Sequence, residues 1–279
     1  MNSLLDGSTG ADSPGAGLPG PGLAGNGTKT LDVPTSHPRY QSLMVRERIV
    51  EGVQRGLTSP HGLLAHGRGE AFDYLIGERT QPFALEAITA AAALLLLAQH
   101  PVLSVNGNVA ALMPEAMVQL AAAIGCPIEV NIFHASAERE QAIADQLRAS
   151  GAVQVLLPEE DGCVLPSLDS NRRRCHPDGI FKADVVFVPL EDGDRCAALV
   201  RTGKQVITID LNPASRTART ATISIVDNLL RVLPLLTREV ERLRGTPHRE
   251  LQALRERYVL ATNLRQARAC IVSSFGDAT

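Results

Sequence analysis

Beyond Pro38, short apolar segments alternate with longer segments of helical periodicity, and this alternation limits the fold more than any other feature. The apolar segments have entirely apolar centres, which is typical of strands that are buried on both faces. Strands separated by helices are joined in parallel, with helices covering both sides of the sheet. The sequence therefore predicts a doubly wound α/β domain with a mainly parallel sheet, a helical N-terminal lead-in and C-terminal helices.

The individual elements follow from the apolar runs and from the Gly and Pro residues between them. We expect strands at 102–105, 128–133, 153–157, 185–188, 206–209 and 222–226. We expect helices at 42–56, 69–76, 83–99, 115–124, 136–149, 195–201, 228–243 and 248–269. Residues 158–182 are expected to be irregular, with Arg172, Arg173 and Arg174 on a solvated loop.

The first 36 residues differ from the rest in composition, because they hold eight of the 23 Gly and four of the 17 Pro. Such a segment buries too little surface to offset its ordering entropy, so residues 1–36 are expected to form a disordered tail. The α/β domain is then expected over 37–245, followed by a helical extension over 246–279. We find no secretory signal, and no apolar stretch reaches the roughly 18 residues that a membrane span needs.

Composition disfavours several classes of function. The formal net charge of −3 implies no general affinity for nucleic acid or anionic membranes, and the chain has no Trp for base stacking. Five cysteines occur without a Cys-x-x-Cys pair, which disfavours a thiolate metal site. An odd number of cysteines without a signal peptide indicates a reducing, cytoplasmic compartment.

Polar residues follow four of the expected strands at their carboxyl ends, where open α/β sheets bind ligands. These clusters are Asn106-Gly107-Asn108, 189–194, 210–213 and Asp227-Asn228. Four clusters at one edge favour a ligand site over ordinary turns, and Gly107 would let the backbone approach a phosphate. Neither the P-loop motif nor G-x-G-x-x-G occurs, which disfavours a standard P-loop kinase or NAD-dependent dehydrogenase.

Two arginines and a histidine are candidates for the site. On the expected helix 42–56, Arg46 falls within an apolar stripe, so it should contact an anion, form a salt bridge or extend to solvent. Arg68 lies between two glycines just before an expected helix start, which suits a phosphate or carboxylate. The alternative for Arg68 is a buried pair with Glu70 or Asp73. His66 could be an acid, a base, an orienting group or a structural histidine.

Further arginines, hydroxyls and carboxylates lie later in the chain. Residues 215–220 add two arginines and three hydroxyls, which suit phosphate oxygens unless they form a solvated loop. Four carboxylates could hold Mg²⁺ or could be solvated turn residues: Glu191, Asp192, Asp194 and Asp210. The combination suits a nucleoside triphosphate with a metal ion, although no metal ligand is assigned.

At these residues the sequence resembles archaeal-type phosphopantothenate synthetase, the 4-phosphopantoate–β-alanine ligase family. The matching segments are Ser36–Tyr40, Ala65–Leu75, Ser104–Leu112, Val188–Arg195, Ile209–Pro213, Ser215–Arg219 and Ile225–Asn228. The resemblance implies a homodimeric enzyme with a Rossmann-like core, in which residues 37–245 form the ATP-dependent ligase domain. It implies that 4-phosphopantoate is joined to β-alanine while ATP is cleaved to AMP and pyrophosphate, within coenzyme A biosynthesis. By the family pattern, the nucleotide contacts are Arg46, Arg68, Asp210, Leu211, Asn212, Arg216, Thr217, Asn228 and Leu229.

This resemblance suggests an adenylation mechanism, because a free carboxylate is a poor acyl donor and AMP is a good leaving group. Arg46, Arg68 and Mg²⁺ would neutralise the phosphates. Asn106 and Asn108 are expected to orient the substrate. Arg39 or Arg219 would supply a cationic pocket for the substrate phosphate. His66 or Glu191 would be the base that takes a proton from the β-alanine amine. The alternatives are a non-catalytic nucleotide-binding regulatory module and an oxidoreductase on a variant Rossmann core.

Overall fold

The computed structural model describes residues 33–37, 39–159, 163–166 and 168–276. The chain divides into two compact units, Met1–Tyr40 and Gln41–Thr279. Residues 1–32, most of the expected tail, lie outside the described residues. In the described part of the first unit, the His37 N–H donates to the Pro34 carbonyl at 2.9 Å, which forms a turn. The sheet belongs to the second unit.

Six parallel strands form the central sheet, in the order β3-β2-β1-β6-β7-β8. Their bounds are β1 (Pro101–Val105), β2 (Ile128–Val130), β3 (Val155–Leu156), β6 (Val185–Phe187), β7 (Gln205–Ile209) and β8 (Ile223–Ile225). Leu103 of β1 lies opposite Ile128 of β2 on one side and Phe187 of β6 on the other. The predicted doubly wound α/β fold is confirmed, and its topological switch point lies between β1 and β6.

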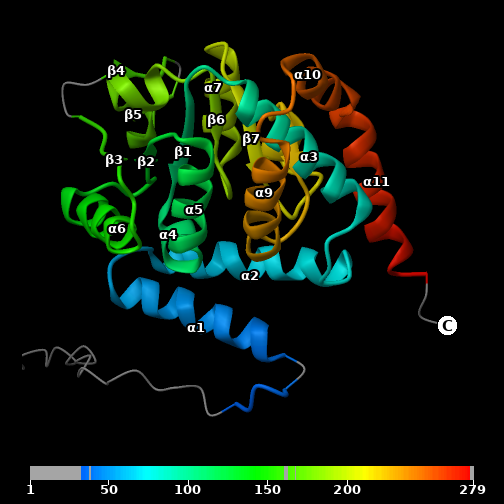
Figure 1. Ribbon diagram of the computed structural model, residues 1–279. Coiled ribbons are helices and arrows are strands. Elements are labelled where there is room, and N and C mark those ends of the chain that lie inside the picture. Colours follow the sequence, from blue (N-terminus) through cyan, green and yellow to red (C-terminus); the bar gives the residue numbers. More distant parts are fainter. Residues whose placement is uncertain (1–32, 38, 160–162, 167, 277–279) are drawn as a thin grey trace, which may run out of the picture. The chain divides into compact units, whose positions relative to one another are not determined.

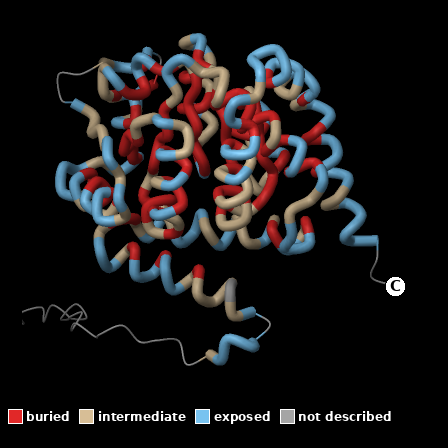
Figure 2. The backbone as a smooth tube through the Cα atoms, in the orientation of Figure 1, coloured by how far each residue is buried: buried red, intermediate tan, exposed pale blue. Residues whose placement is uncertain are grey.

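The strands are buried on both faces, as their apolar centres predict. Leu103 and Phe187 belong to the larger core cluster, whereas the adjacent Val102 and Val186 belong to a smaller cluster on the opposite face. This division follows because successive side chains of a strand point to opposite faces. Figure 1 shows α3, α5 and α9 in front of the sheet, and Figure 2 shows that the most deeply buried segments include the strands behind them.

The helices are α1 (Tyr40–Gln54), α2 (Pro60–Leu75), α3 (Pro82–Leu97), α4 (Gly107–Leu112), α5 (Pro114–Ile124), α6 (Ala137–Ala149), α7 (Gly193–Arg201), α8 (Arg216–Thr220), α9 (Leu229–Leu243), α10 (His248–Arg257) and α11 (Leu260–Ser273). The C-terminal helices pack against the α/β core. For example, the Asn263 amide of α11 donates to the Phe83 carbonyl of α3 at 2.8 Å. The single helix expected at 248–269 is in fact two helices, because α10 ends at Arg257 and α11 begins at Leu260. Both helices contact α3.

Three other helices differ from the sequence-based expectation. Helix α2 begins at Pro60 rather than near Gly69, because Ser59-Pro60 starts this helix instead of ending the previous one. Helices α4 and α8 occupy segments that were expected to be loops. Each is only five or six residues long, and the side chains of Asn106 and Ser215 cap them. Such short helices depend on capping and packing, so helical periodicity does not reveal them.

The segment 158–182 is not simply irregular. Strands β4 (Cys163–Val164) and β5 (Arg174–Cys175) pair antiparallel, with a 3₁₀ turn η1 (Asn171–Arg173) and a π-helical turn η2 (Pro177–Phe181) beside them. The prediction that Arg172 is solvated is wrong, since its side chain is buried. The five cysteines are free thiols.

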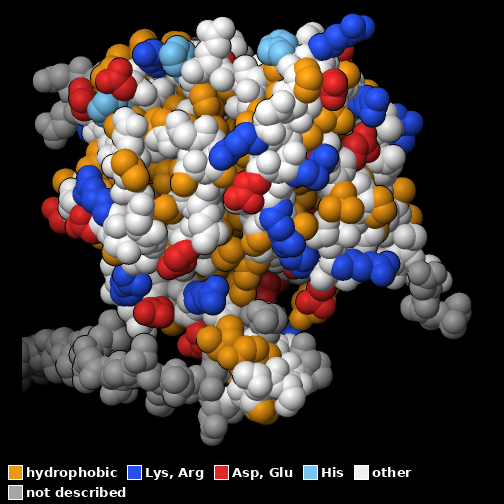
Figure 3. All heavy atoms as spheres, in the orientation of Figure 1, with side chains coloured by type: hydrophobic (Ala, Val, Ile, Leu, Met, Phe, Trp, Pro, Cys, Tyr) orange, Lys and Arg blue, Asp and Glu red, His pale blue; other side chains and the backbone are white. Residues whose placement is uncertain are grey.

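The surface carries mixed charge on the face shown in Figure 3. Lys and Arg side chains there are interspersed with Asp and Glu side chains, in agreement with the small net charge. None of the described helices is both long and apolar enough to cross a membrane.

Candidate functional site

A pocket of about 660 Å³ lies at the carboxyl ends of β1, β2, β6, β7 and β8, with α2 along its other side. It brings together Asn106–Asn108, Leu190–Gly193, Asp210–Asn212 and Asn228, which are separated by more than 120 positions from first to last. The prediction that these polar clusters meet at one edge of the sheet is confirmed. This place is the one where open α/β sheets bind ligands.

One end of the pocket is formed by the loops after β7 and β8. The Asp210 carboxylate accepts hydrogen bonds from the Asn212 N–H, at 2.9 Å, and from the Ser215 hydroxyl. Burial raises the pKa of Asp210, while these two donors and the charge of Arg68 oppose the rise. Asp210 therefore shapes the loop that leads into α8 and adds negative charge beside Arg68.

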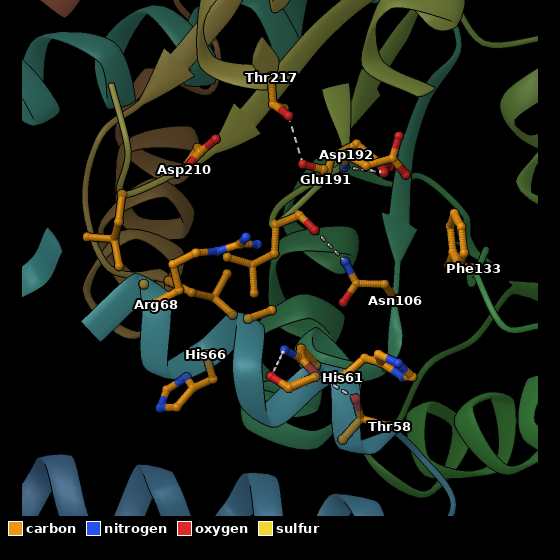
Figure 4. Close-up of a pocket in the computed structure, with 18 of the residues that line it drawn as sticks. Thr58, His61, His66, Arg68, Asn106, Phe133, Glu191, Asp192, Asp210 and Thr217 are labelled. Carbon is orange, nitrogen blue, oxygen red and sulfur yellow. Dashed lines mark hydrogen bonds between the residues drawn. The ribbon is translucent and has the colours of Figure 1, made fainter. Parts of the chain in front are cut away.

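The Arg68 side chain extends from the middle of α2 into the pocket, near Asp210 (Figure 4). Its placement at a helix N-terminus was wrong, because α2 begins eight residues earlier. The two carboxylates considered as its partners are engaged elsewhere: Glu70 binds Arg46, and Asp73 binds Arg231 and Asn228. Among the described residues, no hydrogen bond or ion pair holds the Arg68 guanidinium. It is available to an anionic ligand.

Arg46 forms the salt bridge that the sequence left open. Its Nε donates to both oxygens of Glu70, at 3.0 and 3.1 Å, and the Ser42 hydroxyl donates to the same carboxylate at 3.0 Å. Arg46 is not among the residues that line the pocket, whereas Glu70 is. The apolar stripe was predicted to comprise Leu43, Val50, Val53 and Leu57, and it is partly wrong. Leu57 is buried, but Val50 is exposed, and Val45 and Ile49 are the buried apolar side chains of α1.

His66 is among the residues that line the pocket, but its ring lies on the opposite side of α2 from the Arg68 guanidinium (Figure 4). Its Nε2 is buried without a hydrogen-bond partner among the described residues, and burial lowers the pKa of the imidazole. An imidazole that points away from Arg68 and from the polar loops is poorly placed to take a proton from a ligand there. The structural interpretation of His66 is therefore favoured over the catalytic one.

Glu191 is held in a buried ion-pair network. Each of its two carboxylate oxygens accepts two hydrogen bonds. Oε1 accepts from the Arg172 guanidinium and the Asp192 N–H, and Oε2 accepts from the guanidiniums of Arg172 and Arg195. The Arg195 guanidinium also donates to the Ser104 hydroxyl at 3.3 Å. With both oxygens occupied by two donors each, Glu191 is poorly placed to act as the base. The geometry favours a structural role instead.

Asn106 and Asn108 also have partners within the protein. Asn106 caps α4 through its carbonyl oxygen, and its amide donates to the carbonyls of Pro189, at 3.1 Å, and Leu190, at 3.2 Å. Leu190 has a φ of 56°, so this tether holds a strained loop at the switch point. Gly107 is needed because a Cβ there would clash with the Leu57 carbonyl. The lack of a side chain at Gly107 thus serves a close approach within the protein's own chain, and Gly107 also lines the pocket.

The sequence matches a known family over most of its length. The family model for phosphopantothenate/pantothenate synthetase matches residues 83–274. The chain belongs to this family. It is 52% identical over 236 residues to the 4-phosphopantoate–β-alanine ligase of Methanosarcina mazei, with 85% of this chain and 92% of that protein covered. It is 52% identical over 226 residues to the ligase of the same name from Thermococcus onnurineus, with 81% and 87% covered. It is 50% identical over 221 residues to the ligase of the same name from Thermococcus kodakarensis, with 79% of this chain and 85% of that protein covered.

In this family member, the four carboxylates considered for Mg²⁺ do not form one cluster. Asp194 pairs with Arg216 on the surface, while Glu191 is enclosed by arginines. No three His, Cys, Asp or Glu side chains within the described residues gather to hold a metal ion. Of these four carboxylates, Asp192 and Asp210 line the pocket with part of their surface open.

Most of the nucleotide contacts implied by the family lie together at the end of the pocket near Asp210. Asn212, Arg216, Thr217, Asn228 and Leu229 line it beside Arg68, Asp210 and Leu211. The Thr217 hydroxyl donates to the Glu191 carbonyl at 2.8 Å, and Asn228 caps α9. Of the two arginines suggested for the substrate phosphate, Arg219 does not line the pocket and Arg39 lies in the first unit.

The sequence interpretation missed the residues at the other end of the pocket. These are Thr58, His61, Phe133, His134, Arg139 and Arg172. Phe133 ends an expected strand and His134 follows it, so the strand-end rule applied to the other clusters would have found His134. Thr58 and His61 were missed because α2 was expected to begin later. No sequence signal marks Arg172, which becomes buried through contacts with the loop after β6.

Proposed function

We propose that this protein is an ATP-dependent ligase that condenses 4-phosphopantoate with β-alanine to 4′-phosphopantothenate, releasing AMP and pyrophosphate, in coenzyme A biosynthesis. The observation that carries this proposal is identity of 50% or more with three ligases of that name, over at least 79% of the chain. The pocket supports it, because polar loops and the unpaired Arg68 lie at the edge where an α/β sheet binds phosphates.

ATP would lie at the end of the pocket that Asp210 shapes. The proposed contacts are Arg68, Asp210, Leu211 through its backbone, Asn212, Arg216, Thr217, Asn228 and Leu229, also through its backbone. Arg68 would stabilise charge on the phosphates when the substrate carboxylate attacks the α-phosphate. Arg46 would act one step away, because its bond to Glu70 helps to position α2 and hence Arg68. Pyrophosphate would leave in that step. AMP would then leave as the unprotonated β-alanine amine attacks the activated acyl group and gives up a proton to solvent.

Mg²⁺ fits this arrangement without a preformed metal cluster. The ion usually binds one or two carboxylates together with substrate phosphates and water. Asp210 and Asp192 would be its protein ligands through their remaining lone pairs. Asp192 also accepts hydrogen bonds from the Arg172 guanidinium, at 3.0 Å, and from the Arg195 N–H, at 2.8 Å. When bound, it would offset the negative charge of the triphosphate.

A homodimer is part of the proposal. Three large apolar side chains of α2 face solvent, namely Leu63, Leu64 and Tyr74, and Leu64 is 75% exposed. Exposed apolar patches of this kind commonly mark interfaces. We expect Leu64→Asp to convert a dimer to a monomer in sedimentation or light-scattering experiments. Leu64→Met should leave the dimer intact, and a monomeric wild-type protein would contradict the proposal. The free thiols fit a reducing, cytoplasmic compartment.

One assay tests the proposed reaction. AMP production from ATP should require both 4-phosphopantoate and β-alanine, and 4′-phosphopantothenate should form in equal amount. Stoichiometric ATP binding without AMP release would favour the non-catalytic nucleotide-binding module instead. Binding of NAD with hydride transfer would favour an oxidoreductase.

A further inference from the structure

The pocket has a second cationic end, away from the residues proposed to bind ATP. It is lined by residues from the start of α2 and the segment just before it, the start of α4, the loop between β2 and α6, and the first turn of α6, namely Thr58, His61, Asn108, Phe133, His134 and Arg139. In Figure 4, Asp210 and Arg68 lie on one side of Asn106, and Phe133 lies on the other. A ligand that contacts both ends would therefore place its middle beside Asn106.

Arg139 is a half-buried guanidinium at this end. Within the described residues, its donors reach only the backbone carbonyls of His134 at 2.6 Å, Gly56 at 3.4 Å and Leu57 at 3.4 Å. Burial lowers the pKa of Arg139, and no carboxylate counteracts that effect. Carbonyl groups orient the guanidinium but supply no negative charge, and the two bonds at 3.4 Å are long. By contrast, Arg172 and Arg216, which also line the pocket, are ion-paired with carboxylates.

Two imidazoles stand beside Arg139. The rings of His61 and His134 are 5.0 Å apart between centroids, and both side chains are exposed at the pocket. Phe133 packs edge-on against His134, also at 5.0 Å, which limits the movement of that ring. The Thr58 hydroxyl donates to Asn108 at 2.5 Å, and Asn108 donates to the Gly62 carbonyl at 3.1 Å. Arg139 and the two histidines thus gather at this end of the pocket, and none of the three is paired with a carboxylate within the described part of the chain.

We propose that Arg139, His61 and His134 form the subsite for the phosphate monoester of the acid substrate. This inference rests on the proposed function and adds a specificity determinant to it. A phosphate monoester carries up to two negative charges and three acceptor oxygens, which suit one guanidinium fork and two imidazole donors. With the phosphate bound here, the carboxylate of the same molecule would extend toward Asn106 and the nucleotide. The two anionic groups would be kept apart, so that each meets its own cation.

The subsite gives these residues a selective role. An acid with a hydroxyl in place of the phosphate would leave Arg139 without its counter-charge and would bind weakly. Loss of Arg139 should therefore weaken the phosphorylated substrate much more than its unphosphorylated analogue. A residue that merely stabilised the fold would affect both acids and ATP alike.

The test compares Arg139→Gln and His134→Gln with Arg148→Gln in the full-length protein. Arg148 is the matched control, because it lies on the same helix and its ion pair with Asp145 is exposed. We expect the KM for 4-phosphopantoate to rise about 10- to 100-fold in Arg139→Gln and about 3- to 10-fold in His134→Gln. The KM for ATP should change less than about twofold in both variants, and Arg148→Gln should match the wild type.

Several outcomes would overturn the subsite. One is an unchanged KM for 4-phosphopantoate in both variants, and another is an equal loss of affinity for ATP and for unphosphorylated pantoate. If Arg139→Gln fails to fold, His134→Gln decides, because His134 is exposed. If the wild type releases no AMP, calorimetric binding of 4-phosphopantoate to the wild type and Arg139→Gln still tests the subsite. In that case the proposed reaction would be contradicted, while the proposed phosphate subsite would still be decided by the binding measurement.

Discussion

Two groups of charged residues at the pocket differ in how their charge is neutralised. We call Glu191, Arg172 and Arg195 the floor, and Arg68 and Arg139 the rim. In the floor, Glu191 is fully enclosed by Arg172 and Arg195, and both of its oxygens are occupied. On the rim, Arg68 has no partner among the described residues and Arg139 has only backbone carbonyls. The floor holds the loop after β6 in place, whereas the rim keeps cationic groups open to anionic ligands. Charged residues at the edge of a sheet can thus be structural or functional, and the difference lies in their partners.

The largest effect should come from breaking the floor. Glu191→Gln would leave the buried Arg195 guanidinium without a carboxylate partner and Arg172 with only Asp192, so we expect the free energy of unfolding to fall by about 3–5 kcal/mol. Urea denaturation followed by circular dichroism would measure it. Asp194→Asn is the matched control, because that carboxylate is exposed and its pair with Arg216 should contribute less than about 1 kcal/mol. Wild-type stability with no turnover in Glu191→Gln would instead give Glu191 a catalytic role.

The rim should respond in activity rather than in stability. We expect Arg68→Ala to lower the rate of AMP formation about 100- to 1000-fold, because the charge on the phosphates would lose its stabilising cation. Stability should stay within about 0.5 kcal/mol of the wild type, since no hydrogen bond is lost. Arg79→Ala, which removes an exposed arginine just after the same helix, should leave both quantities unchanged. Normal turnover in Arg68→Ala would remove this residue from the mechanism.

A second buried carboxylate sharpens the comparison. Glu129 of β2 is buried, and its oxygens accept the N–H groups of His176 at 3.2 Å and Ile180 at 2.6 Å instead of an arginine. Burial raises the pKa of Glu129 from 4.5 to about 7. The folded state therefore binds an extra proton between these values, so this group's contribution to stability should decrease as the pH rises from 4.5 toward 7.

Glu129→Gln tests this pH dependence, because it keeps the shape and removes the titration. We expect the stability of the variant to vary less between pH 5 and about pH 8 than that of the wild type. Thermal unfolding across this pH range measures the difference. Parallel curves for the two proteins would mean that the pKa of Glu129 is the same in the folded and unfolded states, which would contradict the expected rise.

The smallest effect is expected at His66. Because its ring lies on the opposite side of α2 from the Arg68 guanidinium, His66→Gln should leave kcat within about twofold of the wild type, whereas loss of a general base typically costs about 10²–10⁴-fold. Steady-state AMP release measures this. A hundredfold loss with an intact fold would restore His66 as the base.

The sequence by itself determined the class of fold and the edge of the sheet at which the pocket lies. Both follow from local patterns: all-apolar centres indicate buried strands, and polar residues after each strand meet because parallel strands end at one edge. The family membership likewise depends only on residues in order. Local patterns failed at Ser59-Pro60, where the same two residues can end one helix or begin the next.

Only the tertiary structure decided which charges are paired. Glu70 binds Arg46, 24 positions away, rather than Arg68, and Glu191 binds Arg172, which sequence had placed in solvent. Ion pairing depends on distance in space and on burial, and neither is encoded in the spacing of residues along the chain. For that reason the sequence identified Arg68 as a candidate but placed it just before a helix instead of within α2, and it did not identify Arg139. Neither arginine has a carboxylate partner among the residues that the structure describes, and this availability to anions is visible only in the folded protein.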